Sequence, residues 1–305
     1  MIAENTKTWG LALSGSGNRS PFYIGFLEVL SEEGLKPDCI SACSGGSLVA
    51  AAYACGTLPE FKERVFGLTP EILKGFLQRD NSHGGLFNID KLEDEIRVYT
   101  KGLNFEDTRP LMGFAAVDIE NGEKVFLSMG DMAKAARISC TLPGVFEPVK
   151  WGGKTLVDGG LLVMVPGRYL REAGMSVTVG VNMRGTRHIF TQGQINAKKL
   201  LNFFKKMLFV DDISQMFGNL FGNGSHDATR MPGMFEVIGK SLDLAIKANK
   251  QFSEHDEECD LMICPDIPKL KKDTFSPQTN RYYYQKGRET ALEYLPKIQN
   301  LIGKE

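Results

Sequence analysis

Two segments near the start of the chain share the same order: a short apolar run, a glycine-rich loop and a helical pattern. The first combines the apolar run 8–13 with the loop letters SGSGN and with apolar residues at helical spacing over 21–33. The second combines the run 38–42 with a glycine-rich turn and the small, apolar segment 45–55. Strands that alternate with helices in this way build a mostly parallel sheet covered by helices. We therefore predict a three-layer α/β/α fold.

The rest of the chain continues this alternation and then departs from it. Further strands are predicted at 111–117, 124–127, 145–149, 155–157, 176–181 and 261–264, and helices at 132–138 and 282–302. From about residue 194 to residue 250, long helical patterns rich in Phe and Met contain no strand. The chain has 305 residues, a length at which α/β folds often stay undivided. We therefore predict one domain over 1–305, with a helical insertion or lid at about 186–250.

The balance of charge excludes some partners. Lys and Arg together number 36 and Asp and Glu number 37, whereas proteins that bind nucleic acid usually carry a clear basic excess. We therefore predict no nucleic-acid partner. The first residues lack the pattern of a secretory signal peptide, and there is no run of about 18 apolar residues that could span a membrane. We expect a cytoplasmic protein whose contact with membranes is at most peripheral.

Six cysteines are present, at positions 39, 43, 55, 140, 259 and 264. Without an export signal, disulfides are not expected. The spacings Cys39-x3-Cys43 and Cys259-x4-Cys264 resemble those of zinc ligands, but neither forms the CxxC pair that structural zinc sites use. Most of these cysteines also lie in apolar runs, so we favour buried thiols and predict no metal site.

Ser44 lies between the second apolar run and the helical segment that follows it. A serine on a sharp strand-to-helix turn is exposed as a nucleophile, and the amides at the helix N-terminus favour negative charge beside it. Gly45 and Gly46 let backbone and substrate approach closely, whereas Ala42 replaces the first glycine of the usual G-x-S-x-G pattern. The alternative is an ordinary helix start with Ser44 as its N-cap. The motif alone does not separate the two interpretations.

The first glycine-rich loop also joins a predicted strand to a predicted helix. Backbone N–H groups at Gly15, Ser16 and Gly17 can form an oxyanion hole for a tetrahedral intermediate. The rival interpretation is a dinucleotide loop, because Gly15-x-Gly17 begins the pattern GxGxxG. The third glycine of that pattern would fall at Ser20, and the chain contains no GxxxxGK[ST]. The loop therefore favours anion stabilisation over nucleotide binding.

Asp158 ends another predicted strand and is followed by Gly159 and Gly160. This pattern holds a carboxylate at the mouth of a sheet, although it is also typical of an ordinary Asp-Gly turn. The chain has four histidines, at positions 83, 188, 226 and 255. The last three follow Asp158, as a Ser-Asp-His triad requires, but none comes after a clear apolar strand. We therefore predict a dyad in which Asp158 itself accepts the proton of Ser44.

In this order the three segments resemble the patatin-like phospholipase family. Its members show a glycine-rich oxyanion loop followed by Arg, then a GxSxG elbow, then a D-G-G or D-G-A aspartate. Here these segments read SGSGNRS at 14–20, ACSGG at 42–46 and DGG at 158–160. Similar segments also occur at 85–87, 111–122 and 137–149, and a proline at 166. The resemblance covers about residues 8–183 and, loosely, 261–265, but not 194–250.

The resemblance implies a hydrolase that cleaves acyl esters of phospholipids or other lipids with a Ser44–Asp158 dyad and no cofactor. Arg19, which follows the oxyanion loop, is expected to clamp that loop by pairing with carbonyls or an acid. A competing hypothesis is a catalytically weak lipid-binding or scaffold protein on the same fold. A third, a hydrolase with a catalytic histidine, has less support.

Departures from the family's pattern bear on this choice. Ser16 and Ser20 replace expected glycines, Ala42 replaces another, and Met164 stands where an Asn is frequent. Ser16 can still offer its backbone N–H if its backbone conformation suits a residue with a side chain. If it does not, the oxyanion hole is distorted and low activity is expected. If the amides of residues 15–17 instead hydrogen-bond within the protein, the site is not competent and the binding protein becomes the better hypothesis.

Residues 194–221 carry a two-sided helical pattern. One side holds Lys198, Lys199, Asn202, Lys205 and Lys206, and the other holds Leu200, Leu201, Phe203, Phe204, Met207 and Leu208. A basic face opposite an apolar face is typical of a helix that lies on a lipid surface. It is also typical of an ordinary amphipathic helix packed on a protein body. We predict that this segment lies over or beside the Ser44 pocket and makes peripheral membrane contact.

Overall fold

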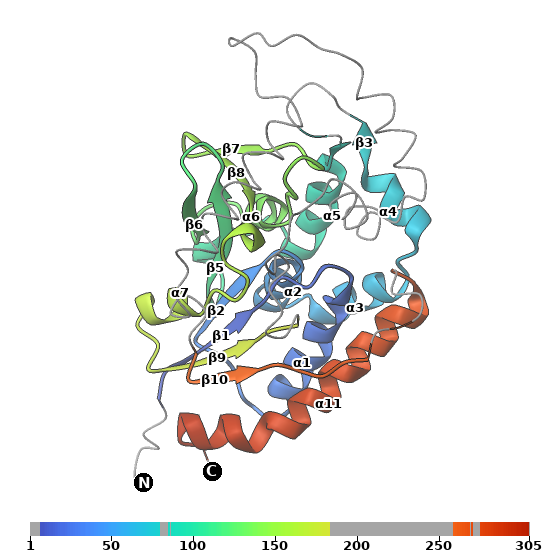
Figure 1. Ribbon diagram of the computed structural model, residues 1–305. Helices are drawn as coiled ribbons and strands as arrows, with labels where there is room; N and C mark the ends of the chain where they lie inside the picture. Colours follow the sequence, from blue (N-terminus) through green and yellow to red (C-terminus); the bar gives the residue numbers. More distant parts are fainter. Residues whose placement is uncertain are drawn as a thin grey trace, which may run out of the picture.

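Figure 1 shows the computed structural model, in which residues 7–79, 85, 87–183, 259–268, 270 and 275–304 are described. The predicted insertion at 186–250, including the two-sided segment 194–221, lies outside the described residues. All four histidines lie outside them as well. The predictions about these residues therefore stay predictions.

The centre of the fold is an eight-stranded sheet with the order β10-β9-β1-β2-β5-β8-β7, in which β6 also pairs with β5. Its strands are β1 (Trp9–Leu13), β2 (Cys39–Cys43), β5 (Leu111–Asp118), β6 (Glu123–Leu127), β7 (Val149–Trp151), β8 (Lys154–Asp158), β9 (Val177–Val181) and β10 (Leu261–Ile263). The strands from β10 to β5 run parallel, whereas β6 and β8 run antiparallel to β5. A separate two-stranded sheet pairs β3 (Gln78–Arg79) with β4 (Phe87–Asn88).

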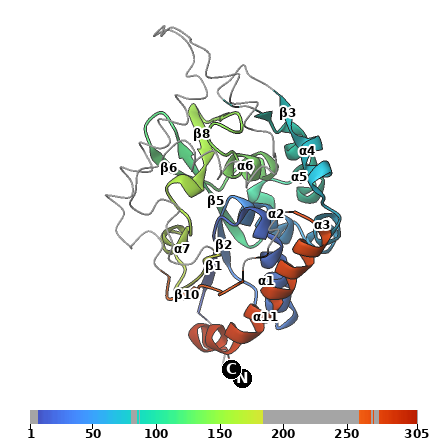
Figure 2. The ribbon, with the colours of Figure 1, turned by 45° about the vertical axis from the view of Figure 1, so that its right-hand side comes forward.

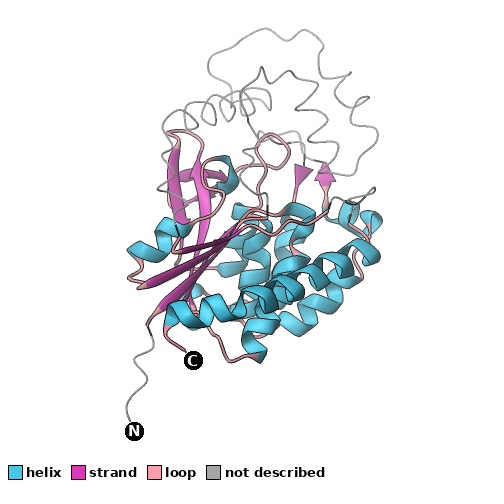
Figure 3. Cartoon of the chain, turned by 60° about the horizontal axis from the view of Figure 1, so that its bottom comes forward, coloured by secondary structure: helices cyan, strands magenta, loops and turns pink. Residues whose placement is uncertain are grey.

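The helices lie on both faces of this sheet, so the predicted three-layer α/β/α arrangement is confirmed (Figures 1 and 3). The α-helices are α1 (Pro21–Glu32), α2 (Gly45–Ala54), α3 (Leu58–Phe66), α4 (Pro70–Phe76), α5 (Asp90–Thr100), α6 (Met132–Ser139), α7 (Gly167–Glu172) and α11 (Pro277–Ile302). Short 3-10 helices are η1 (Gly17–Arg19), η2 (Phe105–Asp107) and η3 (Gly159–Leu161). In Figure 2, α1, α3 and α11 lie on one side of the sheet and α7 lies on the other.

The strands β1, β2 and β9 are buried along their whole length. Burial on both faces is the normal situation of central parallel strands and explains why these segments are continuous apolar runs. Leu13 of β1 pairs with Ala42 of β2. The loops that follow these two strands therefore leave the sheet side by side, at the carboxyl edge where α/β folds place their sites.

One predicted strand is wrong. Residues 145–148 form no strand beyond isolated bridges at Phe146, and β7 begins only at Val149. The reason is a tight turn, in which the Val145 amide donates to the Leu142 carbonyl at 3.1 Å. Pro143 and Gly144 occupy its central positions, and Gly144 has a φ of 76°, which a type II turn requires at that place.

The helices α1 and α11 pack with their backbones in direct contact. A Cβ at Gly25 would lie 2.1 Å from the Tyr284 carbonyl oxygen, and one at Gly287 would lie 1.9 Å from the Phe22 carbonyl oxygen. Since α1 follows the first glycine-rich loop directly, this close contact holds the base of that loop against the C-terminal helix. Both crossing points therefore require glycine.

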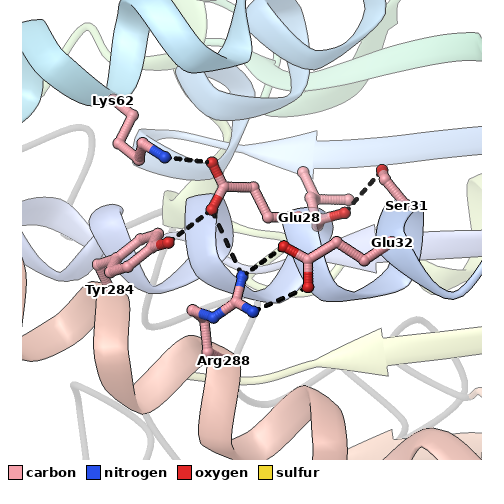
Figure 4. A network of polar contacts seen from close by, with 7 residues as sticks. Glu28, Ser31, Glu32, Lys62, Tyr284 and Arg288 are labelled. Carbon is pink, nitrogen blue, oxygen red and sulfur yellow. Dashed lines mark hydrogen bonds and ion pairs between the residues drawn. The ribbon is translucent and has the colours of Figure 1, made fainter.

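A polar network surrounds this helix crossing (Figure 4). Glu28 accepts hydrogen bonds from Lys62 at 2.8 Å and from the Tyr284 hydroxyl at 2.7 Å, which ties α1 to α3 and α11. Arg288 donates to both carboxylate oxygens of Glu32, each at 2.8 Å. Among the described residues, no helix is both long enough and apolar enough to cross a membrane.

Candidate active site

Ser44 has a strained backbone on a sharp turn between β2 and α2. Its φ of 49° and ψ of −128° belong to a region that residues with a side chain rarely adopt. Its amide donates to the Ser139 hydroxyl at 2.9 Å, and that hydroxyl donates in turn to the Ala115 carbonyl at 2.8 Å. Such outside contacts are needed to hold a conformation that costs about 1–3 kcal/mol.

The Ser44 hydroxyl does not act as a helix cap, because it makes no hydrogen bond to the first turn of α2. The ordinary N-cap interpretation therefore does not describe this serine. The two glycines after it allow α2 to approach the first loop closely. A Cβ at Gly46 would lie 2.9 Å from the Ser14 carbonyl oxygen, and one at Gly45 would lie 3.2 Å from the Gly17 nitrogen. The elbow and the first loop are thus in direct contact.

The first loop forms a concave group of amides. Ser16 has φ −130° and a ψ of −16°, which is close to the ψ of a right-handed residue, and Gly17 follows with a left-handed φ of 55°. Successive amides in this arrangement form a nest that binds anions. Within the described part of the chain, neither the Ser16 amide nor the Gly17 amide donates to another residue. Because the φ of Ser16 suits a residue with a side chain, its replacement of glycine does not distort the loop.

Gly15 differs from its two neighbours in the loop. Its amide donates to the Met164 carbonyl at 3.2 Å, so the prediction that it donates to an oxyanion does not fit this structure. We therefore limit the predicted loop donors to Ser16 and Gly17. A Cβ at Gly15 would lie 3.5 Å from the Ser44 Cβ and 3.1 Å from the Met164 sulfur. Gly15 thus provides room beside the nucleophile.

Arg19 holds the end of the loop by pairing with a main-chain carbonyl, as the sequence predicts. Its guanidinium donates to the Met183 carbonyl at 3.2 Å and lies 5.7 Å from the centre of the Tyr283 ring on α11. At the start of the loop, the Tyr23 hydroxyl is 2.8 Å from the Ser14 hydroxyl and donates to the Ser14 carbonyl at 2.9 Å. The loop is therefore anchored at both ends to α1, β9 and α11.

Asp158 ends β8 and is almost fully buried, with 4% of its surface exposed. Its amide donates to the Thr141 carbonyl at 2.7 Å, and its Oδ1 accepts the Gly160 amide at 2.7 Å. The Cys43 thiol lies 3.7 Å from the same oxygen. Gly159 has no room for a side chain, because a Cβ there would lie 2.5 Å from the Ala115 backbone. These contacts orient the carboxylate beside the residue that precedes Ser44.

The strand register brings Ser44 and Asp158 to the same level of the sheet. Cys43 pairs with Ala115 of β5, and the next residue of β5, Ala116, pairs with Asp158. Ser44 and Asp158 therefore lie on either side of β5, about 9–10 Å apart at their Cα atoms by the usual spacing of strands. Two side chains that lean toward each other can bridge this separation.

Cys140 lies between these two residues and has the wrong protonation state for a nucleophile. Burial raises the pKa of its thiol well above the usual range, and the charge of Asp158 raises it further, against the opposing effect of hydrogen bonds with Ser47 and Ser44. A cysteine attacks as its thiolate, so Cys140 stays inert at neutral pH. The hydrogen bond with Ser44 and the effect of the Asp158 charge place both residues near Cys140.

The other cysteines fit the predicted interpretation as buried thiols only in part. Cys39, Cys43 and Cys55 are buried, whereas Cys259 is half-buried and Cys264 is exposed. Burial, aided by the charge of Asp38, raises the pKa of Cys39 to about 12. Within the described ranges, no three residues of the types His, Cys, Asp or Glu are grouped as ligands for a metal ion.

Two residues that hold the site, Ser139 and Thr141, were not singled out from the sequence, and a third, Met164, was noted only as a departure from the family's pattern. Ser139 holds Ser44, the Thr141 main chain holds Asp158, and the Met164 main chain holds Gly15. The first two lie in the segment 137–149, which the resemblance marked only as a run of small residues. Their one visible signal was the presence of hydroxyl side chains in an otherwise apolar stretch.

Comparison with known proteins identifies the family of this chain. A model of the patatin-like phospholipase family matches residues 11–171, which is more than half of the 305-residue chain. Uncharacterized NTE family proteins of Mycobacterium bovis and Mycobacterium tuberculosis are 28% identical over 176 residues, which cover 58% of this chain and 49% of theirs. The protein named lysophospholipase NTE1 of Cryptococcus neoformans is 27% identical over 186 residues, which cover 57% of this chain and 11% of its own length.

This chain therefore spans about half, or less, of the length of these relatives. Among solved structures, VipD from Legionella pneumophila aligns with a TM-score of 0.47 at 13% identity, over 96% of this chain and 67% of that one. The family match spans the first loop, the elbow and Asp158, which are the three parts that the structure brings to one edge of the sheet. The chain belongs to the patatin-like phospholipase family.

Proposed function

We propose that this protein is a lipid acyl hydrolase that uses Ser44 as nucleophile and Asp158 as base. The observation that carries the proposal is the strained Ser44 elbow, level with Asp158 across β5 and in contact with the amide nest at Ser16 and Gly17. Backbone strain of this kind persists only where neighbouring contacts hold it, and it occurs mainly at functional sites. Family membership supports the general class of a lipid hydrolase.

The proposed chemistry has two halves. Ser44 Oγ bonds to the ester carbonyl carbon while its proton moves to the Asp158 carboxylate, and the carbonyl electrons move onto oxygen. The amides of Ser16 and Gly17, with that of Gly45, stabilise the resulting oxyanion. Collapse expels the alcohol, which takes the proton from Asp158 and leaves an acyl-Ser44. Water then attacks the acyl group in the same way and releases the fatty acid.

The substrate of this hydrolase belongs to the carboxylic esters of lipids. A relative bears the name lysophospholipase, so a lysophospholipid is a reasonable first substrate to test. Other carboxylic esters of lipids would fit the same nucleophile and the same oxyanion donors. No step in this mechanism uses a cofactor or a metal ion.

A second candidate function is a lipid-binding or scaffold protein with weak activity. The observation in its favour is the engaged amide of Gly15, which removes one donor from the loop. The allowed backbone of Ser16 argues against it, because the two remaining loop amides keep the nest geometry.

Labelling with a fluorophosphonate probe separates the two candidates. We expect covalent labelling of the intact protein, complete loss in Ser44→Ala, and loss of at least about 100-fold in labelling rate in Asp158→Asn, because the base is removed. Ser31→Ala is a suitable control, since Ser31 donates to the Leu27 carbonyl on α1, away from the site. An intact, folded protein that does not react with the probe would rule out the hydrolase.

We also propose peripheral membrane contact through residues 194–221, with a cytoplasmic location. This proposal rests on the sequence pattern of basic and apolar sides. In liposome flotation, the double variant Phe203→Glu and Phe204→Glu should lose binding to anionic vesicles while keeping its fold. Unchanged flotation and unchanged lipid turnover would show that the segment has only a structural role.

A further inference from the structure

The Ser16 side chain is a buried hydroxyl without a partner. Ser16 is 6% exposed, and its Oγ makes no hydrogen bond to any residue in the described part of the chain. A buried hydroxyl in this state destabilises a folded protein, and native structures keep few of them. A hydrogen bond to a bound substrate would therefore satisfy this hydroxyl.

The position of this hydroxyl points to the reaction site. The Ser16 Oγ lies 2.9 Å from the point that a Gly45 Cβ would occupy, and the Gly17 nitrogen lies 3.2 Å from the same point. Gly45 is the first residue of α2 and directly follows Ser44. The hydroxyl thus stands among the amides of the nest and the positive end of the α2 dipole, where negative charge is favoured.

We propose that the Ser16 hydroxyl donates a hydrogen bond to the oxyanion of the substrate, in addition to the backbone amides. This inference rests on the proposed hydrolase function. The O–H can rotate toward a substrate oxygen because no acceptor within the protein holds it. No bond of Ser16 is broken in this role, since the hydroxyl remains neutral and keeps its proton throughout.

Two other roles for Ser16 fit less well. A structural role would require a protein partner for the Oγ, and there is none among the described residues. A role as a second nucleophile would require a base, and no described hydrogen bond joins the Ser16 Oγ to one. Gly45 leaves room for this hydroxyl, because a side chain at position 45 would collide with the Ser16 Oγ.

The test compares Ser16→Ala and Ser16→Gly with the intact protein, using a water-soluble 4-nitrophenyl ester of a short fatty acid. Removal of one oxyanion donor lowers kcat by about 100- to 1000-fold in a well-studied protease, and we expect at least about 10-fold here because the three backbone amides remain. The KM should change less than about two-fold, because the bond strengthens only in the transition state. The melting temperature should stay the same or rise, since a buried hydroxyl without a partner is removed.

A transition-state analogue gives a readout that a structural role would not change. The affinity of an aryl boronic acid should fall in the Ser16 variants by the same factor as kcat/KM, whereas the affinity of the product fatty acid should not. Ser20→Ala is the matched control, because Ser20 lies on the same loop with 8% exposure, whereas the atoms nearest to a Gly45 Cβ belong to Ser16 and Gly17. This variant should keep the kcat of the intact protein.

The outcomes separate this inference from the proposed function. If the intact protein and both Ser16 variants hydrolyse the ester at the same rate, the hydroxyl has no role and the inference is wrong, while the hydrolase function stands. If the intact protein neither hydrolyses the ester nor reacts with a fluorophosphonate, both are wrong. Loss of activity together with a lower melting temperature and unchanged affinity for the boronic acid would also overturn the inference.

Discussion

The bond from the Ser44 amide to Ser139 offers a direct test of how the elbow is held. Ser139 is fully buried, and its hydroxyl links the Ser44 amide to the Ala115 carbonyl. In Ser139→Ala the Ser44 amide loses its acceptor, which costs about 1–3 kcal/mol, and loss of the bond to Ala115 adds about 1 kcal/mol. The free energy of unfolding should fall by about 2–4 kcal/mol. For a chain of 305 residues this lowers Tm by about 3–6 °C.

The same substitution should slow the chemistry beyond its effect on stability. With its amide released, Ser44 can relax from φ 49° toward an unstrained conformation. Because a displacement of about 1 Å can reduce a rate about 100-fold, we expect fluorophosphonate labelling to slow by about 10- to 100-fold per folded molecule. Labelling rates at a temperature well below the Tm, with folding checked by circular dichroism, measure this effect.

Thr57→Val is the matched control for Ser139→Ala. The Thr57 hydroxyl donates to the Tyr99 carbonyl at 2.6 Å and the Ala52 carbonyl at 3.2 Å, beyond the far end of α2 from Ser44. This variant should lose a similar amount of stability and keep its labelling rate. Ser139→Ala that is destabilised as expected but labels at the normal rate would refute the idea that this bond holds the elbow.

Three further predictions concern the loop, the helix crossing and the sheet edge. Gly17→Ala should lower the free energy of unfolding by about 1–2 kcal/mol and slow fluorophosphonate labelling at least about 10-fold. Gly152→Ala, with the same φ of 55° and equally open surroundings, should lower stability as much and leave labelling unchanged. Equal labelling rates in the two variants would argue against the amide nest. Gly287→Ala should lower the free energy of unfolding by about 3 kcal/mol, because its Cβ would meet the Phe22 carbonyl at 1.9 Å. Gly75→Ala, whose Cβ has nothing within 4 Å, should raise the free energy of unfolding by about 0.5–1 kcal/mol. Urea unfolding measures both. Burial raises the pKa of Asp260, but hydrogen bonds from Arg171 and Thr178 outweigh this effect and leave the pKa lowered. The carboxylate therefore stabilises the fold fully above its unfolded pKa of about 3.9. This stabilisation is lost as pH falls through its folded pKa. Asp260→Asn should therefore be less stable than the intact protein at pH 7, and the difference should shrink as pH falls through the folded pKa of Asp260. A difference that stays constant down to acid pH would contradict the assignment.

Local patterns in the sequence were sufficient to predict much of the sheet. The apolar runs 8–13 and 38–42 and the helical spacing at 21–33 correspond closely to β1, β2 and α1. These predictions succeed because a buried parallel strand and a packed helix leave continuous or periodic apolar residues in the sequence itself. The helices α3, α4, α5 and α7 were not predicted, since α3 and α5 are amphipathic and mostly half-buried or exposed and α4 and α7 are only 7 and 6 residues long.

The candidate site was predictable where its residues follow strands. Ser44, Asp158 and the loop at 15–17 could be singled out because glycines mark the sharp turns and close approaches that such a site needs. The turn at Pro143 and Gly144 was available from the same kind of signal, and the predicted strand at 145–149 was wrong because the apolar run after the turn outweighed it.

The sequence by itself thus singled out the residues that we propose to carry the chemistry, and the tertiary structure decided how they are held. Ser139 is 95 positions from Ser44 and Met164 is far from Gly15, yet their hydrogen bonds hold the elbow and occupy the Gly15 amide. Such contacts depend on which strands become neighbours and in what register, as when β8 joins β5 antiparallel and brings Asp158 level with Ser44. Periodicity and turn residues report only on neighbours along the chain, whereas these bonds form between segments that meet only after the sheet has assembled.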